Sequence, residues 1–206
     1  IGHEEADHWT HHLHDTIQSG QGLCNEKLSY ELCKNAPDKI LEMRDWKTDW
    51  ANENARIRQV LAPGHEVKRC CYVDFLSTGP AVARTLRGEV AKHKNIKRIS
   101  GITIIDLVVK KSRVVGAIGL HTETGDFVSF AAKAVVLAAG GLTQLFSRNS
   151  ASKNMGGDSH ALALRAGANL IDMEFVQFFP IGHLAPRLVG MDPIMWDPFR
   201  YKLGGK

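Results

Sequence analysis

The second half of the sequence holds two groups of small residues that could bind an anionic or polar ligand. The glycine pair Gly140 and Gly141 directly follows the uncharged apolar run 134–139. The second group consists of Gly156, Gly157, Asp158 and Ser159, followed by Arg165 and Gly167. Glycine lets backbone amides approach a phosphate or a ring directly, because no side chain intervenes. Two interpretations of this spacing remain open: a ligand site, or tight turns and a plain capped helix.

The elements around these residues determine which ligand chemistry is available. The run 134–139 lacks polar alternation, which predicts a strand buried on both faces, as in a parallel sheet. The glycine pair would then lie at the carboxyl end of that strand, where open α/β sheets bind their ligands. Asp158 is expected to cap a helix that closes at Gly167, with its first amides directed toward the glycine-rich segment.

The first part of the chain has a helical pattern of apolar residues. This pattern covers about residues 4–52, with a break at 19–22 and a further helix over about 38–46. The break contains the only close G-x-G of the chain, but it follows a helix and lacks the third glycine. It therefore predicts a helix stop and not a dinucleotide fingerprint.

Strand patterns dominate the rest of the chain. A strand is expected over 66–74, and Pro80 in a first turn predicts a helix from Thr78 to about His93. Four candidate strands follow over 101–139, and the middle two are joined by a hairpin turn at Thr124, Gly125 and Asp126. Helices followed by a mixed set of strands indicate an α/β fold.

Charge and hydropathy exclude several classes of function. The net charge is +4, divided between 7 Lys and Arg against 11 Asp and Glu in residues 1–60 and 19 against 11 in 61–206. The basic later part favours an anionic ligand. Its basic clusters lack interleaved aromatic residues, so a nucleic-acid surface is not expected. The longest uncharged apolar stretch, 134–142, is far shorter than the roughly 20 residues of a membrane helix.

The cysteines and histidines do not predict a metal site. Cys24, Cys33, Cys70 and Cys71 have no zinc-type or disulfide-framework spacing, which favours a reducing, cytoplasmic compartment. Four histidines crowd the N-terminal helix: His8, His11, His12 and His14. Three of them share a face with ligand-like spacing, but no HExxH motif completes it. We interpret them as surface residues and expect no metal. The sequence also lacks a GxSxG motif and a P-loop.

The stretches AKAVVLAAGG and GGDSHALALRAGANLIDMEFVQFFPIG resemble the flavoprotein subunits of succinate dehydrogenase and fumarate reductase and the related L-aspartate oxidase. The patterns of that family read roughly ATGG, TGDG-x-x-M-A-x-R-A-G and MEFVQFHPTG. The earlier stretches HHLHDTIQSGQGLCNEKL, LEMRDWKTDW and VKRCCYVDFLSTGPAVARTL resemble the same family in the same order. The resemblance therefore covers nearly the whole chain.

This resemblance implies FAD as the cofactor and an FAD-dependent oxidoreductase as the enzyme. The fold would be part of a two-dinucleotide-binding-type FAD domain, with a helical N-terminal segment and then a sheet with a β-hairpin insertion. Ala139, Gly140 and Gly141 would line the flavin. Asp158 would hold a polar part of FAD, and the backbone of Thr103 and Ile104 would meet the adenine. These implied cofactor-binding residues are Thr103, Ile104, Ala139, Gly140, Gly141 and Asp158.

The same resemblance indicates an interior fragment of the FAD-binding domain. Residues 1–62 would be its helical segment and 63–206 its β/α core. The phosphate-cradling G-x-G-x-x-G would lie before Ile1, and the lid domain and the proton-transferring arginine would lie elsewhere. No catalytic residue can therefore be named, and the fragment alone is expected to be inactive.

One departure concerns the substrate pocket. Phe179 and Pro180 stand where the family usually has a histidine followed by proline, so a hydrogen-bond donor to a substrate carboxylate is missing. The expected function is hydride exchange between flavin and a small organic acid. The alternative is a non-catalytic binding or assembly module that has lost its substrate site. An iron–sulfur subunit of a larger complex is the partner that the resemblance implies, at the cytoplasmic face of a membrane.

Overall fold

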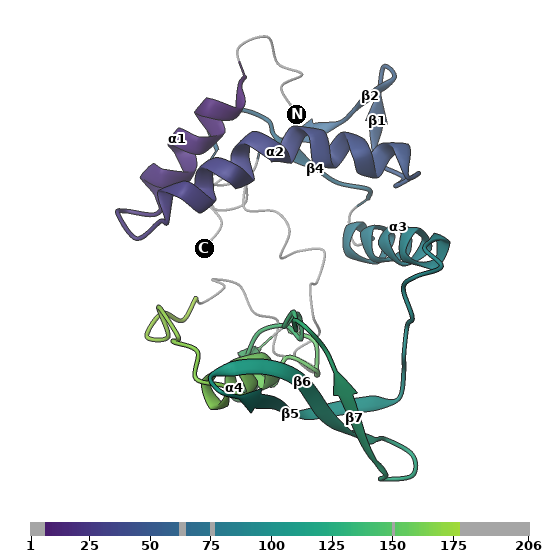
Figure 1. Ribbon diagram of the computed structural model, residues 1–206. Helices are drawn as coiled ribbons and strands as arrows, with labels where there is room; N and C mark the ends of the chain where they lie inside the picture. Colours follow the sequence, from purple (N-terminus) through teal and green to yellow (C-terminus); the bar gives the residue numbers. More distant parts are fainter. Residues whose placement is uncertain (1–6, 62–64, 75–76, 150, 178–206) are drawn as a thin grey trace. The chain divides into compact units, whose positions relative to one another are not determined.

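The computed structural model describes residues 7–61, 65–74, 77–149 and 151–177 (Figure 1). Of these residues, those up to Ile96 form one compact unit and those from Lys97 onward form a second. Each unit is described by itself. The boundary expected near residue 62, between the helical segment and the β/α core, stays a prediction.

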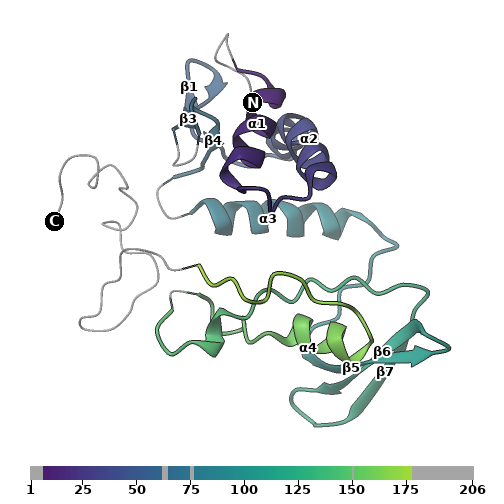
Figure 2. The same ribbon diagram turned by 90° about the vertical axis from the view of Figure 1, so that its left-hand side faces the viewer.

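Two packed helices form the main part of the first unit. Helix α1 (Trp9–Ser19) packs on α2 (Glu26–Asp45), and Cys33, which has no exposed surface, lies 3.6 Å from the Thr16 hydroxyl across that contact (Figures 1 and 2). The expected helix stop at 19–22 is confirmed, because α1 ends at Ser19. The separate helix expected over 38–46 is wrong, since α2 is one helix that continues through Pro37.

Four short strands and a third helix complete this unit. The strands form two antiparallel pairs: β1 (Asn52–Glu53) with β2 (Arg56–Ile57), and β3 (Gln59–Val60) with β4 (Cys70–Cys71). The strand expected over 66–74 is therefore confirmed only at its centre. Helix α3 (Thr78–Lys92) matches its prediction. The buried Thr48 donates its hydroxyl to Thr85 of α3 at 3.0 Å, which attaches α3 to this unit.

The second unit is built on a three-stranded antiparallel sheet. Strands β5 (Ile102–Lys110), β6 (Arg113–His121) and β7 (Phe127–Ala131) lie in the order β5-β6-β7. The predicted hairpin at Thr124–Asp126 is confirmed: Gly125 has a φ of +77°, and Thr124 donates to the Asp126 carboxylate at 2.6 Å. Helix α4 (Asp158–Arg165) contacts β5, and a short 3-10 helix, η1 (Thr143–Leu145), precedes it (Figure 2).

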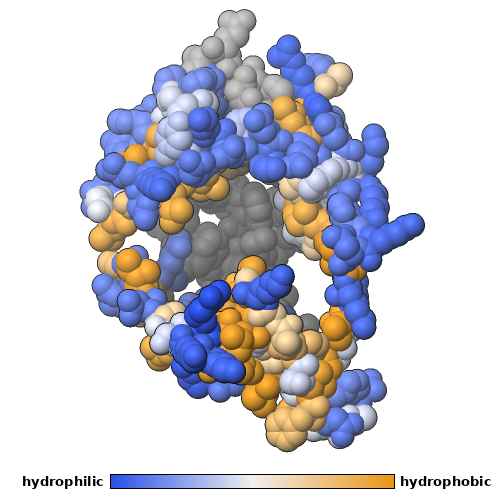
Figure 3. Space-filling view, in the orientation of Figure 1, coloured by the Kyte–Doolittle hydropathy of each residue, from blue (hydrophilic) through white to orange (hydrophobic). Residues whose placement is uncertain are grey.

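The buried strand expected over 134–139 is wrong. This segment pairs with no strand among the described residues, and Val136 is 88% exposed. A strand buried on both faces needs a neighbouring strand on each side. The antiparallel sheet β5-β6-β7 does not include residues 134–139, so it provides no such neighbours. Figure 3 shows apolar side chains gathered over the sheet of this unit. No helix among the described residues has the length and apolar character needed to cross a bilayer.

Candidate cofactor-binding site

Hydrogen bonds join the segment that carries the glycine pair to the turn before α4. Ala139 N donates to the Ser159 hydroxyl at 3.0 Å, and Gly157 N donates to the Gly141 carbonyl at 3.1 Å. One turn further, Gln144 N donates to the Met155 carbonyl at 3.1 Å. Two segments separated by more than ten residues in the sequence therefore form one local structure, as the proposed ligand site requires.

Two glycines of this structure adopt a backbone conformation that side chains disfavour. Gly140 has a φ of +83° and Gly157, the N-cap residue of α4, has a φ of +89°. A Cβ at Gly141 would lie 3.2 Å from the end of the Met155 side chain. The turn interpretation thus explains Gly140 and Gly157 without a ligand, whereas Gly141 keeps the chain close to Met155.

Asp158 is the first residue of α4 and does not cap it. Gly157 occupies the N-cap position, and no side chain makes a capping hydrogen bond there. The expectation that Asp158 caps the helix is therefore wrong, because Gly157 takes that position with its left-handed backbone. The Asp158 side chain is exposed, and its carboxylate has no hydrogen-bond partner among the described residues. It is left available as an acceptor at the positive end of the helix dipole.

Thr103 and Ile104 lie near the start of β5, at the edge of the sheet. Thr103 pairs with Leu120 and Ile104 with Gly119, and both side chains are exposed. Since β5 has a strand neighbour on one side only among the described residues, alternate backbone groups face away from β6. These groups can hydrogen-bond a planar ligand, as expected for the adenine contact.

Helix α4 connects the two halves of the predicted site. Its first turn contacts Ala139 through Ser159, and its last residue, Arg165, contacts β5 next to Ile104. The structure therefore brings Ala139, Gly140 and Gly141 together with Asp158. It links them to Thr103 and Ile104 only through the length of α4. Phe179 and Pro180 lie outside the described residues.

The donors and acceptors of this region fit FAD. The cofactor carries hydroxyl groups that need an acceptor, and the Asp158 carboxylate is an acceptor that no group in the described part of the chain occupies. Its adenine needs backbone donors and acceptors, which the edge of β5 presents. Its rings need close approach to the chain, which the segment from Ala139 to Gly141 permits. In an FAD complex the cofactor would supply the hydride-transfer chemistry, and these residues would hold and orient it.

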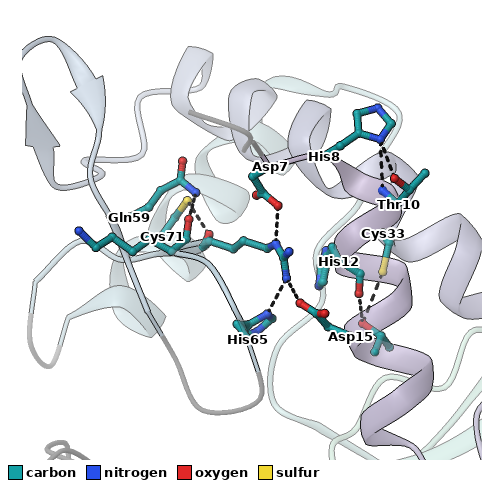
Figure 4. A network of polar contacts seen from close by, with 12 residues as sticks. Asp7, His8, Thr10, His12, Asp15, Cys33, Gln59, His65 and Cys71 are labelled. Carbon is teal, nitrogen blue, oxygen red and sulfur yellow. Dashed lines mark hydrogen bonds and ion pairs between the residues drawn. The ribbon is translucent and has the colours of Figure 1, made fainter. Parts of the chain in front are cut away.

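A second cluster of polar side chains lies in the first unit, where it holds segments distant in the sequence together (Figure 4). Arg69 donates from Nε to Asp7 at 2.9 Å and from Nη1 to Asp15, and it also contacts His65 Nδ1 at 3.3 Å. The side chains of Arg69, Asp7 and Asp15 are only 7%, 4% and 5% exposed. Burial would raise the pKa of Asp15, but hydrogen bonds and charge from Arg69 outweigh it and lower that pKa.

His12 belongs to the same cluster. Its ring lies 5.6 Å from the His65 ring, and burial, with His65 and Arg69 as further causes, lowers the pKa of His12. His8 accepts a hydrogen bond from Thr10 N at the start of α1. No group of three metal ligands occurs among residues 7–61, 65–74, 77–149 and 151–177. The prediction that these histidines are surface residues is wrong for His12, which is half-buried beside His65 and Arg69.

Comparison with known proteins gives the class of this domain. Residues 2–190 match the family of FAD-binding domains. An uncharacterized FAD-dependent oxidoreductase of Methanocaldococcus jannaschii is 37% identical over 177 residues, which is 85% of this chain and 33% of that protein. A succinate dehydrogenase flavoprotein subunit of Rickettsia bellii is 31% identical over 191 residues, which is 88% of this chain and 32% of that protein.

A solved structure agrees with these relatives. Mycobacterium smegmatis Sdh1, solved in complex with UQ1, matches with a TM-score of 0.87 at 33% identity, over 92% of this chain and 34% of that one. The chain is thus an FAD-binding domain of the mixed helix and sheet type. It belongs to the family that includes the flavoprotein subunits of succinate dehydrogenase and fumarate reductase and L-aspartate oxidase. Members of this family are FAD-dependent oxidoreductases, and the chain spans about a third of the length of these relatives.

Sequence reasoning missed several residues that organise the site. In the sequence, Ser159 stands out only as a member of the group 156–159, although its hydroxyl accepts a hydrogen bond from Ala139 N. Asp106 was not noticed at all. A single carboxylate within the apolar stretch ITIIDLVVK is a usable signal, because a charge in such a strand needs a partner.

Proposed function

We propose that this chain forms part of the FAD site of an oxidoreductase that exchanges hydride between the flavin and a small organic acid. The single observation that carries the site is the position of Asp158, an exposed residue with no side-chain hydrogen bond among the described residues. Its two neighbours, Gly157 and Ser159, hydrogen-bond Gly141 and Ala139. Asp158 accepts from a hydroxyl of FAD. Ala139, Gly140 and Gly141 border the flavin, and the backbone of Thr103 and Ile104 holds the adenine.

The substrate and the partners are part of the same proposal. The relatives support a small organic acid, because they include succinate dehydrogenase, fumarate reductase and L-aspartate oxidase. Phe179 and Pro180 contribute to the substrate pocket. An iron–sulfur subunit receives or supplies the electrons at the cytoplasmic face of a membrane. The alternative, a non-catalytic binding or assembly module, is not favoured, because each of these three relatives is named as an oxidoreductase.

The Asp158→Asn variant of the full-length protein tests the cofactor contact. A hydrogen bond to a charged group contributes about 1.5–3 kcal/mol, so we expect FAD affinity to fall at least about tenfold. The melting temperature of the apoprotein should change little, because Asp158 makes no capping bond and its exposed charge at the helix start contributes at most about 1 kcal/mol. FAD binding to the apoprotein is measured by fluorescence quenching.

Glu123→Gln is the matched control for this variant. Glu123 is exposed in the β6–β7 hairpin turn, and its replacement removes the same charge from the same unit. We expect this control to bind FAD like the wild type. Unchanged FAD affinity in Asp158→Asn would return Asp158 to a purely structural position and remove the main support for the site.

A further inference from the structure

Arg165 makes two contacts that fasten the end of α4 to β5. Its Nη2 donates to the Ile105 carbonyl at 2.8 Å, and its Nε donates to the Asp106 carboxylate at 3.2 Å. The same Asp106 oxygen accepts from Leu107 N at 2.9 Å. The Leu107 amide and then Arg165 lower the pKa of Asp106, which keeps the carboxylate charged. We call Arg165, Asp106 and the Ile105 carbonyl the α4–β5 clasp.

The clasp lies at an irregular point of the sheet. Ile104 pairs with Gly119 and Asp106 with Ile118, so Ile105 is the extra residue of a β-bulge. A bulge residue has no partner in the neighbouring strand. Its carbonyl is therefore available to the guanidinium, and the planar fork of arginine reaches this carbonyl and the next side chain together. The contact is specific to this one position along β5.

The clasp also lies on the same face of α4 as Asp158. Asp158, Leu162 and Arg165 are spaced by four and three residues, and Leu162 between them is buried. Seven residues of helix separate Asp158 from Arg165 by about 10 Å. Two and three residues of strand, about 7 to 10 Å, separate Asp106 from Ile104 and Thr103. The clasp thus stands between the two proposed contact groups for FAD.

We propose that Arg165 is a positioning residue for the cofactor. It touches neither half of FAD, but it fixes the distance between Asp158 and the adenine-binding backbone of Thr103 and Ile104. This inference rests on the proposed FAD contacts. A ligand held at both ends gains affinity only when the two sites have the spacing that the ligand can span. Loosening the clasp therefore weakens whole FAD more than either of its halves.

The solvent exposure of the Arg165–Asp106 ion pair allows a positioning role to be distinguished from a role in folding stability. The Arg165 and Asp106 side chains are 49% and 43% exposed, and an ion pair that is half in solvent contributes little to folding stability. The apoprotein should therefore keep its melting temperature when the clasp is removed. A loss of FAD affinity without a loss of stability would have no explanation in folding alone.

The test compares four variants of the full-length protein: Arg165→Gln, Arg165→Lys, Asp106→Asn and Arg113→Gln. Arg113 is the matched control, because it is an exposed arginine of the same sheet whose side chain makes no hydrogen bond or ion pair with the described residues. Three probes are titrated into each apoprotein: FAD, FMN for the flavin half, and ADP for the adenine half. FMN and ADP are measured by competition with FAD, which sets a limit even for weak binding.

We expect Arg165→Gln to lower FAD affinity about tenfold or more and to change FMN and ADP affinity less than threefold. Arg165→Lys and Asp106→Asn should give intermediate losses, since each keeps one of the two contacts. Arg113→Gln should behave like the wild type. Unchanged FAD affinity in Arg165→Gln, or an equal fall for all three probes, would overturn the inference. Failure of the wild-type apoprotein to bind FAD would instead overturn the proposed function.

Discussion

The Arg69 guanidinium lies between two buried carboxylates and joins parts of the first unit that are far apart in the sequence. Asp7 and Asp15 lie 62 and 54 residues before it in the sequence. Local sequence patterns describe neighbours within one helix or strand, so they could not predict this cluster. They did place Asp158 at the start of a helix, but they assigned the capping function to it instead of Gly157.

We expect Arg69→Gln to lower the free energy of unfolding by about 3–5 kcal/mol, because it leaves two buried carboxylates without a cation. Denaturant titration monitored by circular dichroism measures the loss. Arg44→Gln is the control, since Arg44 pairs with Asp45 in solvent, where such a pair contributes about 0–1 kcal/mol. A similar small loss in both variants would show that the cluster does not stabilise the fold.

At the scale of elements, the sequence predicted those whose pattern is complete within the segment. Helix α3 and the β6–β7 hairpin have their start and turn signals in their own residues, and both are confirmed. The segment 134–139 has an apolar pattern that is meaningful only with neighbours on both sides, and the described residues provide none. The separate helix predicted over 38–46 is instead the end of α2, which continues through Pro37 while α1 packs along it.

Two glycines in different elements should respond in opposite directions to alanine. Gly88 lies within α3 with open space at its Cβ position, so Gly88→Ala should stabilise the protein by about 0.5–1 kcal/mol. A Cβ at Gly116 in β6 would collide with the Phe130 carbonyl of β7, so Gly116→Ala should destabilise the protein by about 1–3 kcal/mol. Thermal unfolding of the two variants provides the measurement. The same sign of change in both would contradict the described packing of β6 on β7.

At the scale of the whole molecule, the resemblance predicted the family, FAD and the enzyme class, and the comparisons confirm these three. It could do so because AAGG, GGDSHALALRAGANL and MEFVQFFPIG are local motifs that survive in sequence. The α4–β5 clasp could not be predicted from local motifs, since Asp106 and Arg165 lie 59 residues apart in the sequence. The site residues themselves stay predictions.

The acid response of folding should reflect His12 and Asp15. His12 has a lowered pKa when folded, so the unfolded chain takes up its proton first, and stability falls as pH drops below about 6.5. Asp15 has a lowered pKa when folded, so its contribution is present above about 3.8 and is lost as pH falls through the folded value. The titratable and charged side chains next to His12 and Asp15 are those of Asp7, His65 and Arg69. Unfolding curves recorded from neutral pH to well below the ordinary pKa of an aspartate test both steps, and His12→Gln should remove the first one. A wild-type pH profile in His12→Gln would show that another histidine is responsible.

The four free thiols allow local opening of this protein to be followed by chemical modification. Cys33 has no exposed surface between α1 and α2, whereas Cys24, Cys70 and Cys71 are half-buried. Burial also raises the pKa of Cys70 and Cys71, so little of either is present as the reactive thiolate at neutral pH. An alkylating reagent can reach Cys33 only during moments when the two helices separate. When the reagent is concentrated enough for alkylation to outpace closing, the rate of Cys33 modification equals the rate at which the two helices separate. At lower concentration it reports the equilibrium population of the open state.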